Sequence, residues 1–215
     1  YGNGYVYSSA YQSAASAEKE LRAHIGVSDE LEARHIPMRV GSIRQHWNRN
    51  CLAVGLSQGF IEPLEATALM LVQFTLTHFI TAHSLAVSKG NIEHYRSGFN
   101  DNVTQTFAGI RDYIVAHYQC NTRTDSDYWI DNRSHNHISD SLAAILQCWD
   151  EGGDFEAELL AQQHKQVYPR PSWYCLLAGS GRFPVTGRRI ETTQGIVITS
   201  PAAVRDYCIQ MSQKF

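Results

Sequence analysis

Apolar residues recur at three- and four-residue spacing in the second quarter of the chain, which predicts one long helix. They place one face of a helix from about residue 63 to residue 88 in the core, at Leu64, Ala68, Leu71, Val72, Leu76, Phe79 and Ile80. Just before it, the run from Cys51 to Leu56 is short and almost continuously apolar, which predicts a buried strand of a parallel sheet. Polar residues such as Gln73, Thr75 and His78 interrupt the longest apolar run, so it indicates a core helix and not a membrane span.

The rest of the chain indicates strands and helices in one mixed fold of the α+β or α/β class. Residues 4–9 have the aromatic and β-branched composition of a strand, and a helix follows and ends at Gly26. Two short strands broken near Gly41 are expected within residues 36–47. Beyond Gly90 the pattern is mainly helical, with apolar stripes over 92–119, 139–151 and 200–215 and a polar, aromatic-bearing connection over 121–137.

Composition and charge exclude several classes of function. The 215 residues carry a net charge of -3 without a basic cluster, so we expect neither nucleic acid nor a membrane surface as a partner. Five widely spaced cysteines without a C-x-x-C pair are typical of reduced thiols and indicate a cytoplasmic protein. The string "HNH" at 135–137 lacks a third and fourth ligand, so we interpret it as a hydrophilic loop and expect no metal.

Two carboxylates and a proline stand where the long helix is predicted to begin. Pro63 suits a first helical turn because its missing N–H would have no intrahelical partner. The backbone N–H groups of residues 65–68 would then point out of the helix start and favour an anion. On spacing alone, Glu62 and Glu65 are explained as ordinary helix-start residues. The alternative is that Glu65 is a catalytic group beside that anion site.

Four strings, in order along the chain, resemble motifs of the flavin-dependent tryptophan halogenases. "NRNCLAVGLSQGFIEPLEAT" resembles the family's N-C-x-A-x-G-L-x-x-G-F-x-E-P-L-E-S-T-G signature. "GNGYVYSS" is similar to its G-x-G-Y-V-Y-S strand, "RVGSIRQHW" to its R-x-G-x-x-x-x-x-W segment, and "WYCLLAGSGRFP" to its late I-L-A-G-M-G-x-F-P element. The family's serine is replaced by Ala66 and its glycine by Ala68.

The resemblance implies halogenation with chloride or bromide. In the family, reduced FAD and oxygen convert a halide to hypohalous acid, which halogenates an indole ring in a separate pocket. The family's catalytic glutamate maps onto Glu65, and its halide-binding backbone N–H groups map onto Thr67 and Ala68. Flavin contacts are expected at Gly55, Leu56 and Ala66. The cofactor would be FAD, reduced by a separate flavin reductase, with a halide ion beside it.

The resemblance also extends to the substrate region in "AHYQCNTRTDSDYWID". Tyr128 and Trp129 stand at the family's aromatic pair that sandwiches the indole, although a Tyr-Trp pair between helices is also common core packing. In the family's free-tryptophan enzymes, two tyrosines and a glutamate hold the amino acid backbone of the substrate. His117 and Tyr118 stand at the tyrosine pair, and Thr124 replaces the glutamate. The ammonium group of free tryptophan would therefore lose a charge-assisted hydrogen bond of about 1.5–3 kcal/mol. We therefore expect a simpler or differently carried indole, or another electron-rich arene, instead of free tryptophan.

Together these features predict the C-terminal portion of a flavin-monooxygenase-like FAD module over residues 1–88, followed by a mainly helical substrate module over 89–215. The family's G-x-G-x-x-G fingerprint, catalytic lysine and W-x-W-x-I-P motif are not found here, so we expect the chain to be part of a longer enzyme. The alternatives are a flavin-dependent aromatic monooxygenase and a non-catalytic remnant that binds an aromatic ligand. A small aromatic substrate and a flavin reductase are the expected partners, and homodimer formation is left open.

Overall fold

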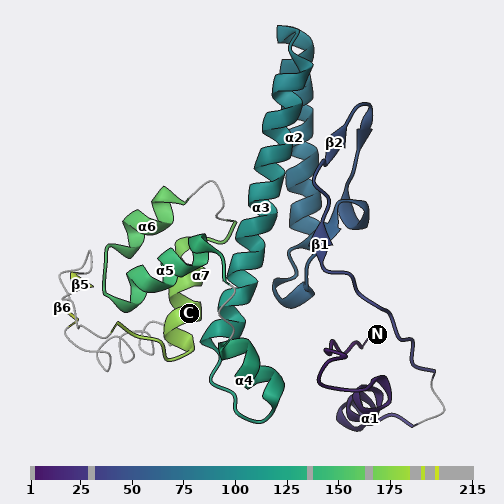
Figure 1. Ribbon diagram of the computed structural model, residues 1–215, viewed down its shortest axis with the longest axis vertical. Coiled ribbons are helices and arrows are strands. Elements are labelled where there is room, and N and C mark those ends of the chain that lie inside the picture. The colour runs from purple at the N-terminus through teal and green to yellow at the C-terminus, as the bar shows by residue number, and fades with distance from the viewer. Residues whose placement is uncertain are drawn as a thin grey trace.

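Two long helices form an antiparallel hairpin at the centre of the computed structural model. The structure describes residues 3–28, 32–134, 138–162 and 167–184 and two short strands beyond them. The helices α2 (Ala68–Lys89) and α3 (Ile92–Cys120) run side by side over most of their lengths (Figure 1). Gly90 joins them at φ 71°, in the left-handed region that glycine tolerates, and its N–H donates to Ala86 O. The side chain of Asn91 then caps α3 by accepting from His94 N.

α3 is shared by two hydrophobic cores. One core packs α3 against α2 and the β2 strand, and contains Trp47, Leu71, Ala86, Phe99, Val103, Phe107, Ile110 and Ile114. The other packs the C-terminal half of α3 against three shorter helices, α5 (Asp140–Asp150), α6 (Phe155–Ala161) and α7 (Arg170–Gly179). The short helix α4 (Asp127–Ser134) lies at the lower end of α3 (Figure 1).

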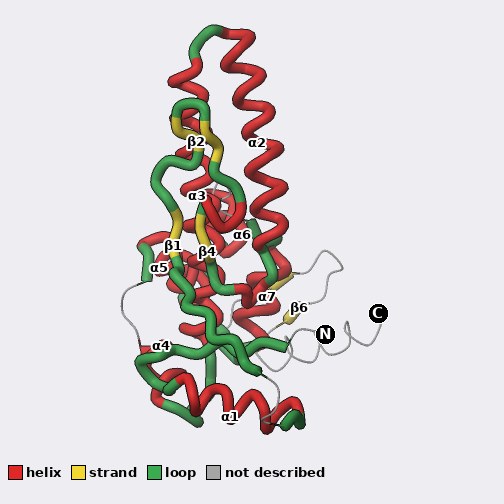
Figure 2. The backbone as a smooth tube through the Cα atoms, turned by 90° about the vertical axis from the view of Figure 1, so that its right-hand side faces the viewer, coloured by secondary structure: helices red, strands yellow, loops and turns green. Residues whose placement is uncertain are grey.

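The strands are short and antiparallel. β1 (Gly41–Ser42) pairs with β4 (Gly59–Phe60), and β2 (Trp47–Asn48) pairs with β3 (Cys51–Leu52). Figure 2 shows these strands running alongside the helical hairpin. A third pair joins β5 (Ile190–Glu191) to β6 (Val197–Ile198).

The buried parallel strand predicted over Cys51–Leu56 is therefore wrong. Cys51 is exposed, and the chain leaves the extended conformation at Val54 to form the 3-10 turn η1 (Gly55–Ser57). The Ser57 hydroxyl accepts from Val54 N at 3.1 Å and donates to Val54 O at 2.9 Å, which closes the turn. The expectation of two strands broken near Gly41 agrees with β1 and β2, which are shorter than predicted.

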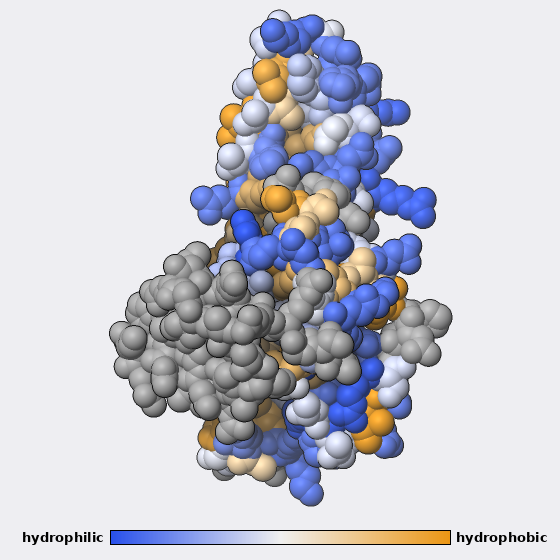
Figure 3. All heavy atoms as spheres, turned by 90° about the vertical axis from the view of Figure 1, so that its left-hand side faces the viewer, coloured by the Kyte–Doolittle hydropathy of each residue, from blue (hydrophilic) through white to orange (hydrophobic). Residues whose placement is uncertain are grey.

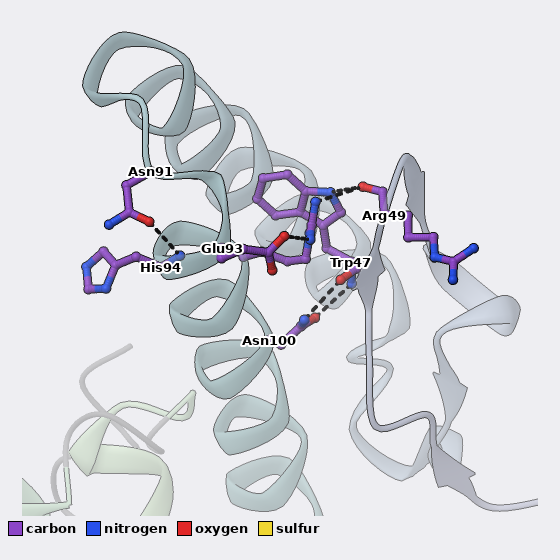
Figure 4. Close-up of polar contacts among 7 residues, drawn as sticks. Trp47, Arg49, Asn91, Glu93, His94 and Asn100 are labelled. Carbon is purple, nitrogen blue, oxygen red and sulfur yellow. Dashed lines mark hydrogen bonds and ion pairs between the residues drawn. The ribbon is translucent and has the colours of Figure 1, made fainter.

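The β2–β3 hairpin is attached to α3 through one asparagine. Asn100 on α3 accepts from Trp47 N at 2.7 Å and donates to Trp47 O at 3.0 Å, as a neighbouring strand would (Figure 4). The Trp47 indole N–H donates to Arg49 O at 3.1 Å within the hairpin turn. Trp47 is 2% exposed, so this attachment lies at the edge of the core.

The N-terminal residues differ from the prediction in part. The helix expected before Gly26 is present as α1 (Ala14–Ile25), capped by the Ser13 side chain. Residues 4–9, predicted as a strand, have no regular secondary structure. Tyr11, two residues after this segment, contacts α4. Its hydroxyl donates to Asp131 Oδ2 at 2.8 Å, and its ring packs edge-on against Tyr128.

The face of α2 that was predicted to be buried is only partly covered within this chain. Leu71 is 8% exposed, whereas Leu76 is 42% and Ile80 64% exposed. Apolar residues also lie between hydrophilic ones along the upper part of the face drawn in Figure 3. Among the described residues, α2 is the one helix whose length and composition would fit a membrane span, a property that core helices of soluble proteins share.

Candidate functional site

Glu65 closes a separate turn that precedes α2. Pro63–Glu65 forms the 3-10 turn η2, Ala66 follows at φ 51° and ψ 30°, and Thr67 is the N-cap residue of α2. The helix therefore begins at Ala68, five residues later than predicted. The Ala66 N–H donates to Pro63 O at 3.0 Å and is not available to an anion, which corrects the predicted donor set.

The first turn of α2 still presents free backbone donors. The N–H groups of residues 68–70 have no intrahelical acceptor, because the first such bond runs from Leu71 N to Thr67 O at 2.9 Å. The left-handed conformation of Ala66 costs about 1 kcal/mol for a residue with a Cβ. This strained residue is what turns the chain between the Glu65 carboxylate and the helix start.

His117 on α3 is the ionic partner of Glu65. Its Nε2 lies 3.0 Å from Glu65 Oε1, and its Nδ1 lies 2.9 Å from the carbonyl oxygen of Tyr113, one turn earlier on the same helix. The two side chains are 24% and 35% exposed respectively, so both remain open on one side. A carboxylate from the segment before α2 is thereby joined to the C-terminal part of α3.

One buried phenol, Tyr113, and one partly buried phenol, Tyr168, border this pair. Tyr168 stacks on Tyr113 with ring centroids 3.9 Å apart, and its hydroxyl donates to Thr67 Oγ1 at 3.3 Å. Burial, together with the Glu65 charge, raises the pKa of Tyr113 to about 12. Burial also raises the pKa of Tyr168. Both phenols therefore stay neutral at physiological pH and add no negative charge beside Glu65.

An aromatic cluster forms around Tyr118, the residue that follows His117 on α3. Tyr118 stacks on Trp129 with ring centroids 5.7 Å apart and an interplanar angle of 19°. Tyr128 packs edge-on against both, at 6.0 Å from Tyr118 and 5.1 Å from Trp129. The Tyr118 hydroxyl donates to Glu62 Oε1, and burial with this hydrogen bond raises the pKa of the phenol. The Arg123 guanidinium lies 4.4 Å from the Trp129 ring centroid.

Comparison with known proteins identifies the family. The family model described as "Tryptophan halogenase" matches residues 1–194. The chain belongs to the tryptophan halogenase family. It is 33% identical to the 7-chloro-L-tryptophan 6-halogenase of Kutzneria sp. (strain 744), over 98% of this chain and 40% of that protein. The chain thus spans about 40% of the length of this curated relative.

Solved halogenase structures have the same fold. The thermophilic tryptophan halogenase from Streptomycin violaceusniger superimposes with a TM-score of 0.76 at 30% identity, over 98% of this chain and 39% of that one. A flavin-dependent halogenase from Brevundimonas sp. BAL3 gives 0.73 at 27% identity, over 97% of this chain and 39% of that one. These likenesses confirm the predicted family and show that the chain corresponds to part of a halogenase.

Within this halogenase-family chain, the predicted site residues form two groups attached to the same part of α3. Glu65, Thr67 and Ala68 lie close together at the start of α2. Tyr118, Tyr128 and Trp129, predicted to bind substrate, contact one another, and Tyr118 directly follows the partner of Glu65. Gly55 and Leu56, predicted to contact flavin, lie on η1, which packs against α2. His135 and His137 lie outside the described residues.

Sequence reasoning missed three contributions to the site. The contact of His117 with Glu65 had a weak signal, since His117 and Tyr113 share one face of α3 at a spacing of four residues. The hydrogen bond that Glu62 accepts from Tyr118 also had no sequence signal, and it agrees with the interpretation of Glu62 as a structural residue. Tyr168 gave no signal, because it lies in a proline-flanked segment about 100 residues from the hydroxyl that it contacts.

Proposed function

We propose that this chain supplies the glutamate and the arene-binding residues of a flavin-dependent halogenase. The substrate would be an indole or another electron-rich arene, and the halide chloride or bromide. One observation carries the proposal: Glu65 lies 3.0 Å from His117, and the next residue, Tyr118, stacks on Trp129. A carboxylate from the segment before α2 and an aromatic pair that includes Trp129 of α4 are thus attached to consecutive residues of α3, an arrangement that suits halogenation of a ring.

The chemistry asks for a proton acceptor beside the ring. A ring carbon attacks the halogen of hypohalous acid, so a carbon–halogen bond forms and the oxygen–halogen bond breaks. The ring proton must then leave, and together with the released hydroxide it makes water. The Glu65 carboxylate is the group placed to accept that proton. It is 35% exposed in this chain and is therefore accessible to a ring.

The start of α2 suits the halide. The N–H groups there are unpaired by the helix itself, and the helix dipole favours negative charge at this end. We assign halide binding to the backbone of Thr67 and Ala68. The Tyr168 hydroxyl donates to the Thr67 side chain and thereby fixes the residue from which the helix starts.

The residues predicted to contact FAD fit an exposed flavin edge. Gly55 has φ +64°, and a Cβ built there would meet Val72 Cγ2 at 3.8 Å in the described part of the chain. Leu56 is 83% exposed. These residues and Ala66 would hold part of the cofactor. When bound, reduced FAD with oxygen supplies the oxidising equivalents that convert halide to hypohalous acid.

The exposed face of α2 supports the assignment of residues 1–88 to a flavin module and of 89–215 to a substrate module. Leu69 is 83%, Ile80 64% and Val87 69% exposed, an apolar face of a kind that is costly to leave in water. Because the chain spans 40% of its curated relative, we propose that the rest of the flavin module covers this face. A cytoplasmic location and a separate flavin reductase belong to the same proposal.

The residues around Tyr128 and Trp129 favour a ligand without a free ammonium group. Thr124 is exposed and offers no carboxylate, and the nearby Arg123 is paired with Asp125 at 2.5 Å. An amino acid substrate would therefore lack a partner for its ammonium group. An indole without that group, or an arene carried on another molecule, meets the aromatic residues without this cost.

The test uses the protein with a complete flavin module, reduced FAD, halide and indole. Glu65→Gln keeps the size of the side chain but accepts protons poorly, so halogenated product should fall at least about tenfold while flavin binding stays within about twofold. Unchanged product formation would refute the role of Glu65. Hydroxylated product formed without added halide would instead identify an aromatic monooxygenase.

A further inference from the structure

The contacts around Glu65 and His117 determine how many protons lie between the two side chains. The Tyr113 carbonyl oxygen can only accept, so the nitrogen 2.9 Å away, His117 Nδ1, must carry a hydrogen. Across the ring, Nε2 and Glu65 Oε1 lie 3.0 Å apart, and two bare lone pairs at that distance would repel. One proton therefore lies between them, on the imidazole or on the carboxyl group.

The surrounding residues fix the orientation of the imidazole in this pair. Tyr113 is 4% exposed, and its ring packs edge-on against the imidazole at 4.9 Å, which together with the Nδ1 hydrogen bond fixes the imidazole plane. The two phenols near the pair, Tyr113 and Tyr168, donate their hydroxyl hydrogens elsewhere, to Ser172 O and to Thr67 Oγ1. Within the described residues, neither of these phenol hydroxyls donates to Glu65, and His117 is its ionic partner.

Resting on the function proposed above, we infer that His117 is the positioning residue of Glu65. The imidazole holds Oε1 and leaves Oε2 for the arene. After Oε2 takes the ring proton, the pair holds two protons. His117 Nε2 gives up its own proton to solvent and takes the other from the carboxyl group, which restores the carboxylate to its accepting state. No oxidant or reductant is needed for this step, because only a proton moves.

Three variants of the complete enzyme test this inference. His117→Ala removes both the hydrogen bond and the proton exchange, so kcat should fall about tenfold to a hundredfold, as for the loss of a charge-assisted hydrogen bond, while the KM for the arene changes less than about threefold. His117→Gln keeps a donor but cannot take up a proton, so its kcat should remain at least about fivefold low. His94→Ala, an exposed histidine at the start of the same helix, is the matched control and should match the parent enzyme.

Combining the variants separates this inference from the function on which it rests. In a Glu65→Gln background, His117→Ala should cause no further loss, because the residue acts only through Glu65. A wild-type kcat for His117→Ala or His117→Gln, alongside an inactive Glu65→Gln enzyme, would overturn the role of His117 alone. A loss that appears in KM and not in kcat would also overturn it, by making His117 a substrate contact. Full activity of Glu65→Gln would overturn the proposed function itself.

Discussion

Replacing Asn100 with alanine tests whether one side chain attaches the β2–β3 hairpin to α3. The amide makes two hydrogen bonds to the Trp47 backbone, at 2.7 and 3.0 Å, beside a tryptophan that is 2% exposed. Each bond contributes about 1 kcal/mol, and leaving a buried N–H and C=O unpaired adds to the loss, so the free energy of unfolding should fall by about 2–3 kcal/mol. For a chain of this size that corresponds to a melting temperature lower by about 5–10 °C.

The assay is thermal unfolding followed by circular dichroism and by tryptophan fluorescence. Asn48→Ala, on the exposed side of the same strand, is the matched control and should change the free energy of unfolding by less than about 0.5 kcal/mol. Asn100→Asp keeps the acceptor for Trp47 N but loses the donor to Trp47 O, so it should fall between the parent and Asn100→Ala. A melting temperature for Asn100→Ala within about 1 °C of the parent would refute the reasoning, since it would mean that water replaces the amide at no cost.

Three further changes probe the backbone and the phenols around the site. Gly59→Ala would place a methyl group 2.7 Å from Gly41 O and 2.9 Å from Phe107 Cε1, so a urea melt should show a loss of about 1–3 kcal/mol; an unchanged midpoint would contradict the tight β1–β4 approach. Ala66→Gly should raise the free energy of unfolding by up to about 1 kcal/mol in the same assay, because it relieves a φ of 51°, and a loss of stability would argue against strain there. The pKa of Tyr113 is raised from 10.0 to about 12 in the folded state, so the unfolded chain releases this proton first and stability should be lost as pH rises from 10 to 12. Tyr113→Phe should flatten that decline in alkaline unfolding curves, and an equally steep decline would assign it to other groups.

The family could be predicted from the sequence better than the secondary structure around the candidate site. The resemblance, and with it the candidate residues Glu65, Thr67 and Ala68, rests on a sequence motif, and a motif keeps its order whether the segment is helical or not. The segment from Val54 to Ala66 was harder, since its apolar composition resembles a buried strand while Ser57 and two left-handed residues turn it into 3-10 turns. Propensity favoured the strand, and local hydrogen bonding prevailed.

Periodicity identified the apolar face of α2 but could not say what covers it. Leu71 faces α3 and is buried, whereas Leu76 and Ile80 belong to the same predicted face and remain largely exposed. A pattern of apolar residues records that burial is required, not whether the partner lies in the same stretch of chain. Tyr168 illustrates the opposite limit, because its contact with Thr67 depends on how α7 packs on α3, which no local pattern encodes.

The geometry of the site depends on the end of one helix. Asn121, directly after α3, donates to Tyr118 O at 2.5 Å and to Trp129 O at 3.2 Å, so it ties α4 and its tryptophan to the last turn of α3. His117 ties Glu65 to the same turn. The Glu65 carboxylate and the Trp129 ring, which come from either side of α3 in the sequence, are thus held by two consecutive residues of this helix, His117 and Tyr118. A substitution that displaces the end of α3 should therefore disturb both halves of the site together, whereas one confined to α4 should alter arene binding and leave the Glu65–His117 pair in place.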